Sequence, residues 1–340
     1  MYNLCCISLS LKKSGSNHRA FRFTQFEKHS RSDALEILGE RSLENLQTTL
    51  DTMKFARTRG WGYRISSTLF PLFNLAKANV GLHDLPNATL VQDKFDEIKQ
   101  FTRQFAPTQF RLSFHPDHFN VLCSANEGVV QRTINELAHH GWLMDNMVDN
   151  SRSYWYPLNI HMSRSSGDPK TIASEFIKNY DKLDDSVKSR LVLENEDKGV
   201  WTPDRLYNLI HQEIGIPITY DNLHHKCNPG EWSTSEAFER CYSTWHRHGC
   251  TPLFHYSEGG ANDNPRAHTD FSISAPELFR NEYDTTVTRN QSIDWDVELK
   301  QKDYAINNIE EIEAKAKKRA QVNKRTKRRI DAARERSVPS

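Results

Sequence analysis

The residues best suited to chemistry lie in the stretch D-N-L-H-H at positions 221–225. An apolar, β-prone run (216–220) leads into Asp221, and Asn-Pro-Gly at 228–230 ends any regular element that follows. We therefore expect Asp221 at the C-terminal end of a strand, with two imidazoles just beyond it. A carboxylate and an imidazole are ligands that Mn²⁺ or Zn²⁺ accepts, although an Asp–His pair can also cap a turn.

Eight short apolar runs, separated by amphipathic patterns, predict the elements that position this stretch. The predicted strands are 3–9, 62–65, 110–114, 157–161, 191–194, 217–221, 252–255 and 294–298. The predicted helices lie near 40–59, 92–106, 128–148, 170–181, 203–214 and 234–247. Such alternation predicts an α/β fold, a (β/α)₈ TIM barrel over 1–302. The connection 256–293 has little helical pattern, which fits an active-site loop or a strand count that is off by one.

Six consecutive predicted strands end in a His, Glu or Asp. In chain order the residues at or just after these ends are His115, His161, Glu194, Asp221 with His224, His255 with His268, and Glu298. Barrel strands converge on one mouth at their C-terminal ends, so these side chains are expected to meet. One such His is more often structural, but eight nitrogen and oxygen ligands exceed the need of one ion. The pattern therefore predicts two or three divalent ions, which suits phosphodiester hydrolysis.

Charge is distributed unevenly along the 340 residues. The net charge is +1, yet the segment 314–340 holds eleven Lys and Arg against two acidic residues. That segment carries +9, which leaves −8 on the remainder. An acidic body with a basic tail is typical of a protein that touches nucleic acid, although a solvated extension, helical or disordered, is the plainer interpretation of 303–340.

No stretch approaches the roughly 18 apolar residues of a membrane span, and no basic leader with an apolar core opens the chain. The six Cys form no C-x-x-C pair, which fits reduced thiols. We expect a cytoplasmic protein, of bacterial or phage origin, that is a monomer with no obligate protein partner and no membrane contact.

Several motifs resemble the UV damage endonuclease family. They are R-L-S-F-H-P (111–116), L-V-L-E-N-E-D (191–197), D-N-L-H-H-K-C-N-P-G (221–230), Y-R-I-S-S-T-L-F-P (63–71), A-H-T-D (267–270) and C-C-I-S-L (5–9). The match runs in order from about residue 3 to about residue 302. The resemblance implies a TIM-like barrel related to endonuclease IV that incises double-stranded DNA immediately 5′ to cyclobutane dimers, 6-4 photoproducts and abasic sites, typically with Mn²⁺.

Carried over by position, the resemblance implies roles for the residues already picked out at the strand ends. The implied metal ligands are His115, His161, Glu194, Asp221, His224, His255, His268 and Glu298. Within that set, Glu194, Asp221, His255 and Glu298 are assigned to the activated water, as the catalytic residues. The implied lesion-binding residues are His118 and Phe119, which would enter the duplex opposite the lesion, and Ser8 in the N-terminal loop. The alternative for His118 and Phe119 is packing beneath their loop.

The chain also departs from the family pattern. Relatives carry a Gln-Tyr pair where this chain has His118-Phe119, and Asn where it has Ser8. A Lys that is modified to a metal-bridging carbamate in many relatives is replaced by Leu253. The metal-binding His expected after the second strand is absent in register, where Asn74 stands, and His83 is an extra candidate ligand. Two ions and three ions are therefore both open.

Two other functions fit parts of the pattern. A metal-dependent sugar isomerase barrel also places carboxylates and imidazoles at strand ends, but it gives His118-Phe119 and the basic tail no role. A catalytically weakened barrel that binds damaged DNA without cutting it would account for Leu253 and the missing His. Metal content separates this binding module from a nuclease, because a nuclease of this type needs at least two ions.

Overall fold

The computed structural model describes residues 1–117, 119–260, 264–283 and 291–336. Its eight strands form one parallel sheet in the order β6-β5-β4-β3-β2-β1-β8-β7. The strands are β1 (Tyr2–Cys5), β2 (Gly62–Ile65), β3 (Leu112–Phe114), β4 (Leu158–Ile160), β5 (Leu191–Glu194), β6 (Ile218–Thr219), β7 (Leu253–Tyr256) and β8 (Asp294–Val297). The predicted (β/α)₈ barrel and its strand count are confirmed.

The ring closes between β6 and β7, just beyond the short strand β6. Asp221 pairs with His255 in an isolated parallel bridge, and the His255 backbone N–H donates to the Tyr220 carbonyl oxygen at 3.0 Å. Two predicted ligands therefore flank the seam that completes the barrel.

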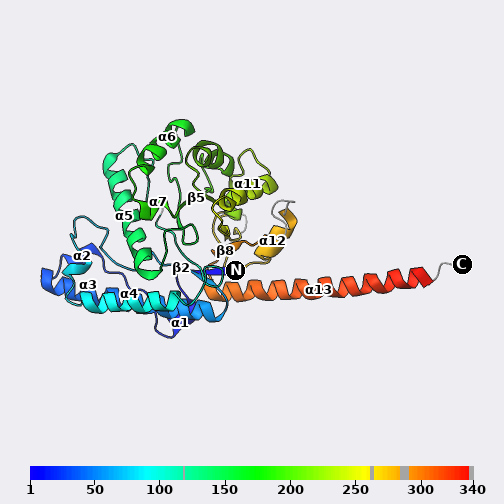
Figure 1. Cartoon of the computed structure of the whole chain (residues 1–340), viewed down its shortest axis with the longest axis horizontal. Helices are drawn as coiled ribbons and strands as arrows, with labels where there is room; N and C mark the ends of the chain where they lie inside the picture. Colours follow the sequence, from blue (N-terminus) through cyan, green and yellow to red (C-terminus); the bar gives the residue numbers. More distant parts are fainter. Residues whose placement is uncertain (118, 261–263, 284–290, 337–340) are drawn as a thin grey trace.

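Helices surround the sheet (Figure 1). They are α1 (Leu9–Lys13), α2 (Phe23–Phe26), α3 (Arg31–Thr58), η1 (Leu82–Asp84), α4 (Ala88–Thr102), α5 (Glu127–Met147), α6 (Pro169–Tyr180), α7 (Asp185–Lys188), α8 (Pro203–Leu206), η2 (Tyr207–His211), α9 (Gln212–Ile214), α10 (Asn222–Cys227), α11 (Thr234–His246), α12 (Pro276–Tyr283) and α13 (Lys302–Arg336). A π-helical turn, η2, divides the segment predicted as one helix over 203–214. The connection predicted to have little helix contains α12.

Two element boundaries differ from the prediction for local reasons. The first strand ends at Cys5 rather than residue 9, because Cys6 has a left-handed φ of 68° and Ser8 then caps α1. Helix α3 begins nine residues before the predicted start, because the Ser30 hydroxyl accepts a hydrogen bond from the Asp33 backbone N–H.

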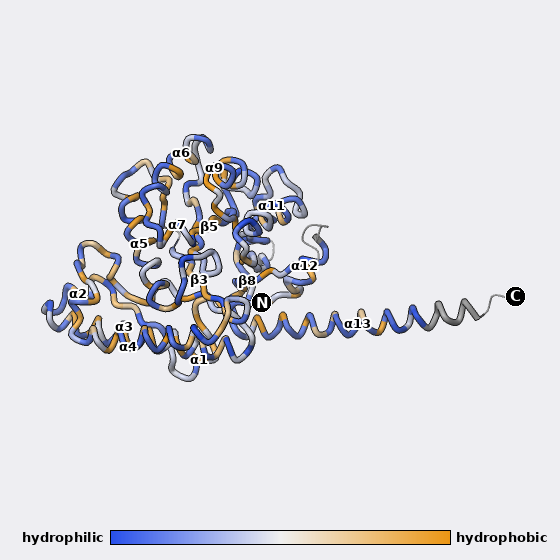
Figure 2. The backbone as a smooth tube through the Cα atoms, in the orientation of Figure 1, coloured by the Kyte–Doolittle hydropathy of each residue, from blue (hydrophilic) through white to orange (hydrophobic). Residues whose placement is uncertain are grey.

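The core lies between the sheet and its helices, and its largest members include the buried indoles of Trp61, Trp201, Trp245 and Trp295. Figure 2 shows hydrophobic residues on central strands such as β5, with hydrophilic residues on the outer loops. Burial of this apolar surface is the main favourable contribution to the fold.

A buried guanidinium closes the N-terminal end of the barrel. Arg111, which is fully buried, donates to the backbone carbonyls of 154–155 at 2.9 Å and of Thr251 at 2.7 Å. It also donates to the Asp294 carboxylate at 3.0 Å, and the Met1 amine lies 3.0 Å from the other oxygen of that carboxylate. Both charges are thus paired at this end.

The first turns of α13 pack on the barrel. Asp303, Ile306 and Ile309 are buried there, and the Trp61 indole N–H donates to Glu310 at 2.6 Å. The predicted boundary at 302/303 thus falls at the start of a helix whose first turns contribute to the core. The division into two domains stays a prediction.

None of the described helices is long and apolar enough to cross a membrane. All six cysteines are free thiols, as the absence of paired spacing predicts.

Candidate metal centre

The side chains predicted at the strand ends converge on the C-terminal mouth of the barrel. His115 follows β3, His161 follows β4, Glu194 ends β5, Asp221 lies two residues past β6, His255 lies in β7 and Glu298 follows β8. His224 occupies the first turn of α10, and His268 lies in the connection after β7. Parallel barrel strands bring their carboxyl ends to one edge, which explains why residues so distant in sequence meet here.

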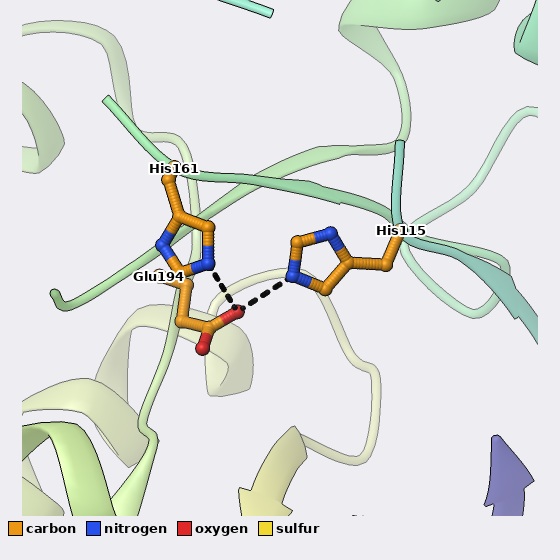
Figure 3. A group of neighbouring side chains, drawn as sticks. All are labelled: His115, His161 and Glu194. Carbon is orange, nitrogen blue, oxygen red and sulfur yellow. Dashed lines mark hydrogen bonds and ion pairs between the residues drawn. The ribbon is translucent and has the colours of Figure 1, made fainter. Parts of the chain in front are cut away.

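The Glu194 carboxylate is the hub of the cluster. It is fully buried, and one oxygen lies 3.2 Å from His115 Nε2, 3.7 Å from His161 Nε2 and 3.1 Å from His255 Nδ1. Figure 3 shows the His115 and His161 rings pointing at this same oxygen. The other oxygen lies 3.1 Å from His224 Nδ1. Four imidazoles from different elements therefore share one carboxylate.

Asp221 both caps a helix and contributes to the cluster. Its Oδ1 accepts the His224 backbone N–H at 2.6 Å, so the turn-cap interpretation holds for this oxygen. The Asn195 side-chain oxygen accepts the Asp221 N–H at 2.9 Å, and the Asn195 carbonyl lies 2.9 Å from His224 Nδ1. The adjacent His225 is buried 5.4 Å from the Tyr220 ring, so it packs outside the cluster.

Glu298 forms the other side of the cluster with a permanent cation. One of its oxygens contacts the Arg64 guanidinium and lies 3.4 Å from His255 Nδ1. The other oxygen lies 3.9 Å from His268 Nε2. Arg64 is also 3.5 Å from Asp296, whose carboxylate faces His255 Nε2 at 3.5 Å. This side therefore holds one permanent positive charge against two carboxylates.

Three overlapping groups of these side chains could hold a metal ion. They are His115 with His161 and Glu194, His115 with His255 and Glu298, and Glu194 with Asp221 and His224. Within each group the ligand atoms lie within 4.8 Å of one another. The buried Asp221 Oδ2 makes no hydrogen bond among the described residues, and Glu194 Oε1 makes none although His224 is near. Buried acceptors without donors are costly, so the residues present fit divalent ions.

The electrostatics of the mouth favour added positive charge. Burial raises the pKa of Glu194, but the charges of His255 and His161 outweigh it and hold that pKa well below its usual range. Burial lowers the pKa of His255, yet Glu194 and Glu298 bring it to about 9. Burial lowers the pKa of His161 to about 4. The carboxylates therefore favour protonation of His255, and a metal ion bound at this position would compete with that proton.

Two candidate ligands lie outside these groups in the described part of the chain. His268 is at the margin, near Glu298 only. The His83 side chain is 87% exposed and lies 3.5 Å from Asp84. It lines a groove of about 640 Å³ with Phe73 and Trp142, away from the cluster. Leu253 is buried at the start of β7, two residues before the ligand on that strand.

The lesion-binding candidates have different surroundings. Phe119 is 76% exposed, so it does not pack beneath its loop. It lines a groove of about 680 Å³ that includes Lys77 and Arg132. The Ser8 hydroxyl is buried and accepts the Leu11 backbone N–H at 3.2 Å as the cap of α1. His118 lies outside the described residues.

Sequence reasoning missed three polar residues beneath the ligands. The Asn159 amide donates to Glu194 Oε2, while Arg64 and Asp296 support Glu298 and His255 as described. A usable signal exists, because alternate residues of a strand face the same side. Asn159 lies two residues before the ligand that follows β4, and Asp296 lies two before the one that follows β8.

The fold and the site define a parallel α/β barrel with a candidate metal centre in its mouth. The family model described as UV-endonuclease UvdE matches residues 2–331, and the chain belongs to this family. It is therefore an endonuclease of UV-damage repair, and the resemblance seen in the sequence motifs is confirmed.

Named relatives and solved structures agree with this placement. A UV DNA damage endonuclease from Bacillus velezensis is 30% identical over 295 residues, covering 85% of this chain and 86% of that protein. A UV-damage endonuclease from Schizosaccharomyces pombe is 28% identical, over 87% of this chain and 47% of its own length. The crystal structure of SacUVDE superposes with a TM-score of 0.71 at 26% identity, covering 89% of this chain and 94% of that one. Endonuclease IV from Thermus thermophilus, at a TM-score of 0.51, 13% identity and coverage of 78% and 94%, shares the fold.

Proposed function

We propose that the chain, as a monomer, hydrolyses the phosphodiester bond immediately 5′ to cyclobutane dimers, 6-4 photoproducts and abasic sites in double-stranded DNA. Two or three divalent ions, Mn²⁺ in the first place, would serve the reaction. The observation that carries the proposal is the set of three ligand groups around Glu194, in a barrel of the UV-endonuclease family.

The side chains that would hold these ions fall into two groups with different roles. Glu194, Asp221, His255 and Glu298 would face the reacting water, and His115, His161, His224 and His268 would complete the ligand sets. Bound divalent ions lower the pKa of water and neutralise charge on phosphate oxygens. Asn159 and Arg64 support this arrangement, since they hold the two glutamates in place through the contacts described above.

A cleft of about 400 Å³ gives the substrate access to the ligands. Its lining includes His161, His224, Ser163 and Lys198, and Lys198 is exposed. An exposed ammonium beside the cluster suits a DNA phosphate, because charge attraction supplies most of the affinity for the backbone. The exposed Phe119 would stack on bases near the lesion, together with His118. Ser8 stays a weaker candidate, because its hydroxyl already caps α1.

The test is incision of an oligonucleotide duplex that contains one thymine dimer. With Mn²⁺ we expect a single nick 5′ to the dimer and a product with a 3′-hydroxyl, and we expect none after removal of metal by EDTA. Denaturing gels and end-group analysis measure both results. A protein that binds the duplex but leaves it intact in Mn²⁺ would contradict the proposal.

A second candidate is a barrel that binds damaged DNA without cutting it. The buried Leu253 favours it, because this side chain cannot form the metal-bridging carbamate that a modified Lys supplies in many relatives. Elemental analysis of the purified protein separates the two functions. Fewer than two ions per chain, with preserved affinity for a damaged duplex, would favour the binding module. The sugar isomerase alternative is set aside, because the chain belongs to a nuclease family.

A further inference from the structure

Helix α13 runs from the mouth of the barrel toward its opposite end. Near its start, Asp303 accepts the Leu9 backbone N–H at 2.6 Å, and Leu9 lies beyond the C-terminal end of β1. Ten residues later, Glu313 accepts from the hydroxyl of Tyr2, the first residue of β1. By Glu313, α13 has therefore reached the N-terminal end of the strands, away from the metal centre.

The helix then continues past the barrel, as Figure 1 shows. Residues 317–328 are all exposed. From 314 to 328 the chain contains eight basic residues and no Asp or Glu: Lys315, Lys317, Lys318, Arg319, Lys324, Arg325, Lys327 and Arg328. At 1.5 Å per residue this segment, named here the basic extension, spans about 22 Å.

The chemistry of the basic extension selects a polyanion as its partner. At 100° per residue the eight cations cover all sides of the helix, so none of its faces is apolar enough for a protein core. Several cations are three or four residues apart, including Lys315 with Lys318 and Lys324 with Arg328, and such like-charge pairs destabilise a helix. Neutralisation by closely spaced phosphates would relieve that repulsion. In an endonuclease of UV-damage repair, the fitting polyanion is duplex DNA.

We propose that the basic extension binds the phosphate backbone of a DNA segment other than the one held at the mouth. The extension points away from the mouth, and a duplex stays nearly straight over distances well below its persistence length of about 150 base pairs. One short duplex therefore cannot reach both sites, and one chain can bridge two segments. The bridging step rests on the proposed function, because it takes the mouth as the first DNA site.

Three variants isolate the charge of the extension. The first ends at Ala314, which keeps the turns with Ile306 and Ile309 in the core. The second replaces all eight basic residues with Gln at full length. The third replaces only the five Lys residues of the extension with Arg, and so preserves charge as a matched control.

The first measurement is affinity for an undamaged 40-base-pair duplex in EDTA across a series of NaCl concentrations. Fluorescence anisotropy should show that truncation and the Gln variant each lower the slope of log K against log salt by about 3 to 7, at roughly 0.9 for each phosphate that is no longer neutralised. The Lys→Arg control should keep the slope of the full chain. Equal slopes for all four proteins would overturn the proposal, as would a tail-dependent slope seen with duplex RNA and not with DNA.

The second measurement is capture of a labelled duplex by protein already held on an immobilised duplex. The full chain and the Lys→Arg control should capture it, whereas the truncated and Gln variants should lose at least tenfold of the signal. Incision of a 14-base-pair dimer duplex should stay within twofold in every variant. If none of the proteins cuts it, the proposed function fails while the EDTA binding result still decides the role of the extension. A more than tenfold loss of the incision rate on this short duplex at limiting protein on truncation would overturn the proposal of a separate segment.

Discussion

The two ends of the barrel handle buried charge in opposite ways. At the N-terminal end, Arg111 and Asp294 are matched to each other and to backbone carbonyls or the Met1 amine. At the mouth, the buried Asp221 Oδ2 makes no hydrogen bond among the described residues, and Glu194 is surrounded by imidazoles. The buried charges at the N-terminal end are paired with one another, whereas the mouth can accept further cations.

We therefore expect the N-terminal end of the barrel to matter mainly for stability and the mouth mainly for the reaction. A buried ion pair that loses one partner leaves an uncompensated charge, so the N-terminal end should be sensitive in folding. The mouth holds acceptors ready for a ligand, so its changes should affect the reaction first. Arg64 is intermediate, because it pairs with Glu298 and Asp296 inside the mouth.

The largest expected effect is on incision by Glu194→Gln. We expect a loss of about a thousandfold or more, because the amide removes the charge shared by two of the ligand groups. Affinity for undamaged duplex should stay within about twofold in gel-shift titrations. Glu97→Gln is the matched control, since Glu97 is half-exposed and pairs with Lys94 on the surface. Activity within tenfold of the unmodified protein would remove Glu194 from the site.

The next effect is on folding, by Arg111→Met at the opposite end. Asp294 would stay buried without this partner, so the free energy of unfolding should fall by about 3 to 5 kcal/mol in urea titrations. The folded fraction at low temperature should retain incision within a few-fold. Arg103→Met, which breaks an exposed pair with Asp149, should leave the free energy of unfolding nearly unchanged. An equal loss of stability in Arg111→Met and Arg103→Met would contradict the view that the buried ion pair matters more than the exposed one.

A smaller effect should follow from Asn159→Ala beneath the ligands. The amide donates to Glu194 Oε2 and so restrains the carboxylate on which four imidazoles converge. Loss of such a support typically lowers metal affinity or activity by about 10-fold to 100-fold. Raising the Mn²⁺ concentration should recover part of the rate if affinity is what falls. A variant with unchanged rate and unchanged Mn²⁺ dependence would show that Asn159 supports the fold only.

The mildest effect is a pH dependence of stability from a buried imidazole outside the mouth. Burial lowers the pKa of His140 to about 4, against about 6.5 in the unfolded chain. Between these pH values the unfolded chain binds a proton that the folded chain does not. The free energy of unfolding should therefore fall as pH drops from 6.5 toward 4, with His140 contributing about 1.4 kcal/mol per pH unit. Urea titrations of His140→Leu in EDTA should show a shallower dependence, and an identical one would contradict this assignment.

Much of this molecule follows from strand periodicity and from where polar residues interrupt it. A strand ending in Glu194, or an apolar run leading into Asp221, shows where a ligand lies, because barrel strands point their ends at one mouth. The same reasoning placed the eight strands, and the structure bears out their count and order.

Other features depend on contacts between distant segments. Arg64 and Asp296 carry no local signal that they pair, since 232 positions separate them and they meet because β1 pairs with both β2 and β8. The early start of α3 depends on one capping hydroxyl, and the burial of its polar Asn45 depends on bonds to the loops at Arg19 and Leu69. Periodicity does not reveal such partners.

The seam between β6 and β7 lies beside the candidate metal centre. The His255 amide proton, held by the Tyr220 carbonyl, is flanked by Asp221 and by the His255 imidazole, and Glu194 links the two sides. Cations bound to these side chains would therefore help to hold the ring closed. The hydrogen-exchange rate of this one amide in deuterated water would then report the metal occupancy of the mouth, and the measurement needs no DNA.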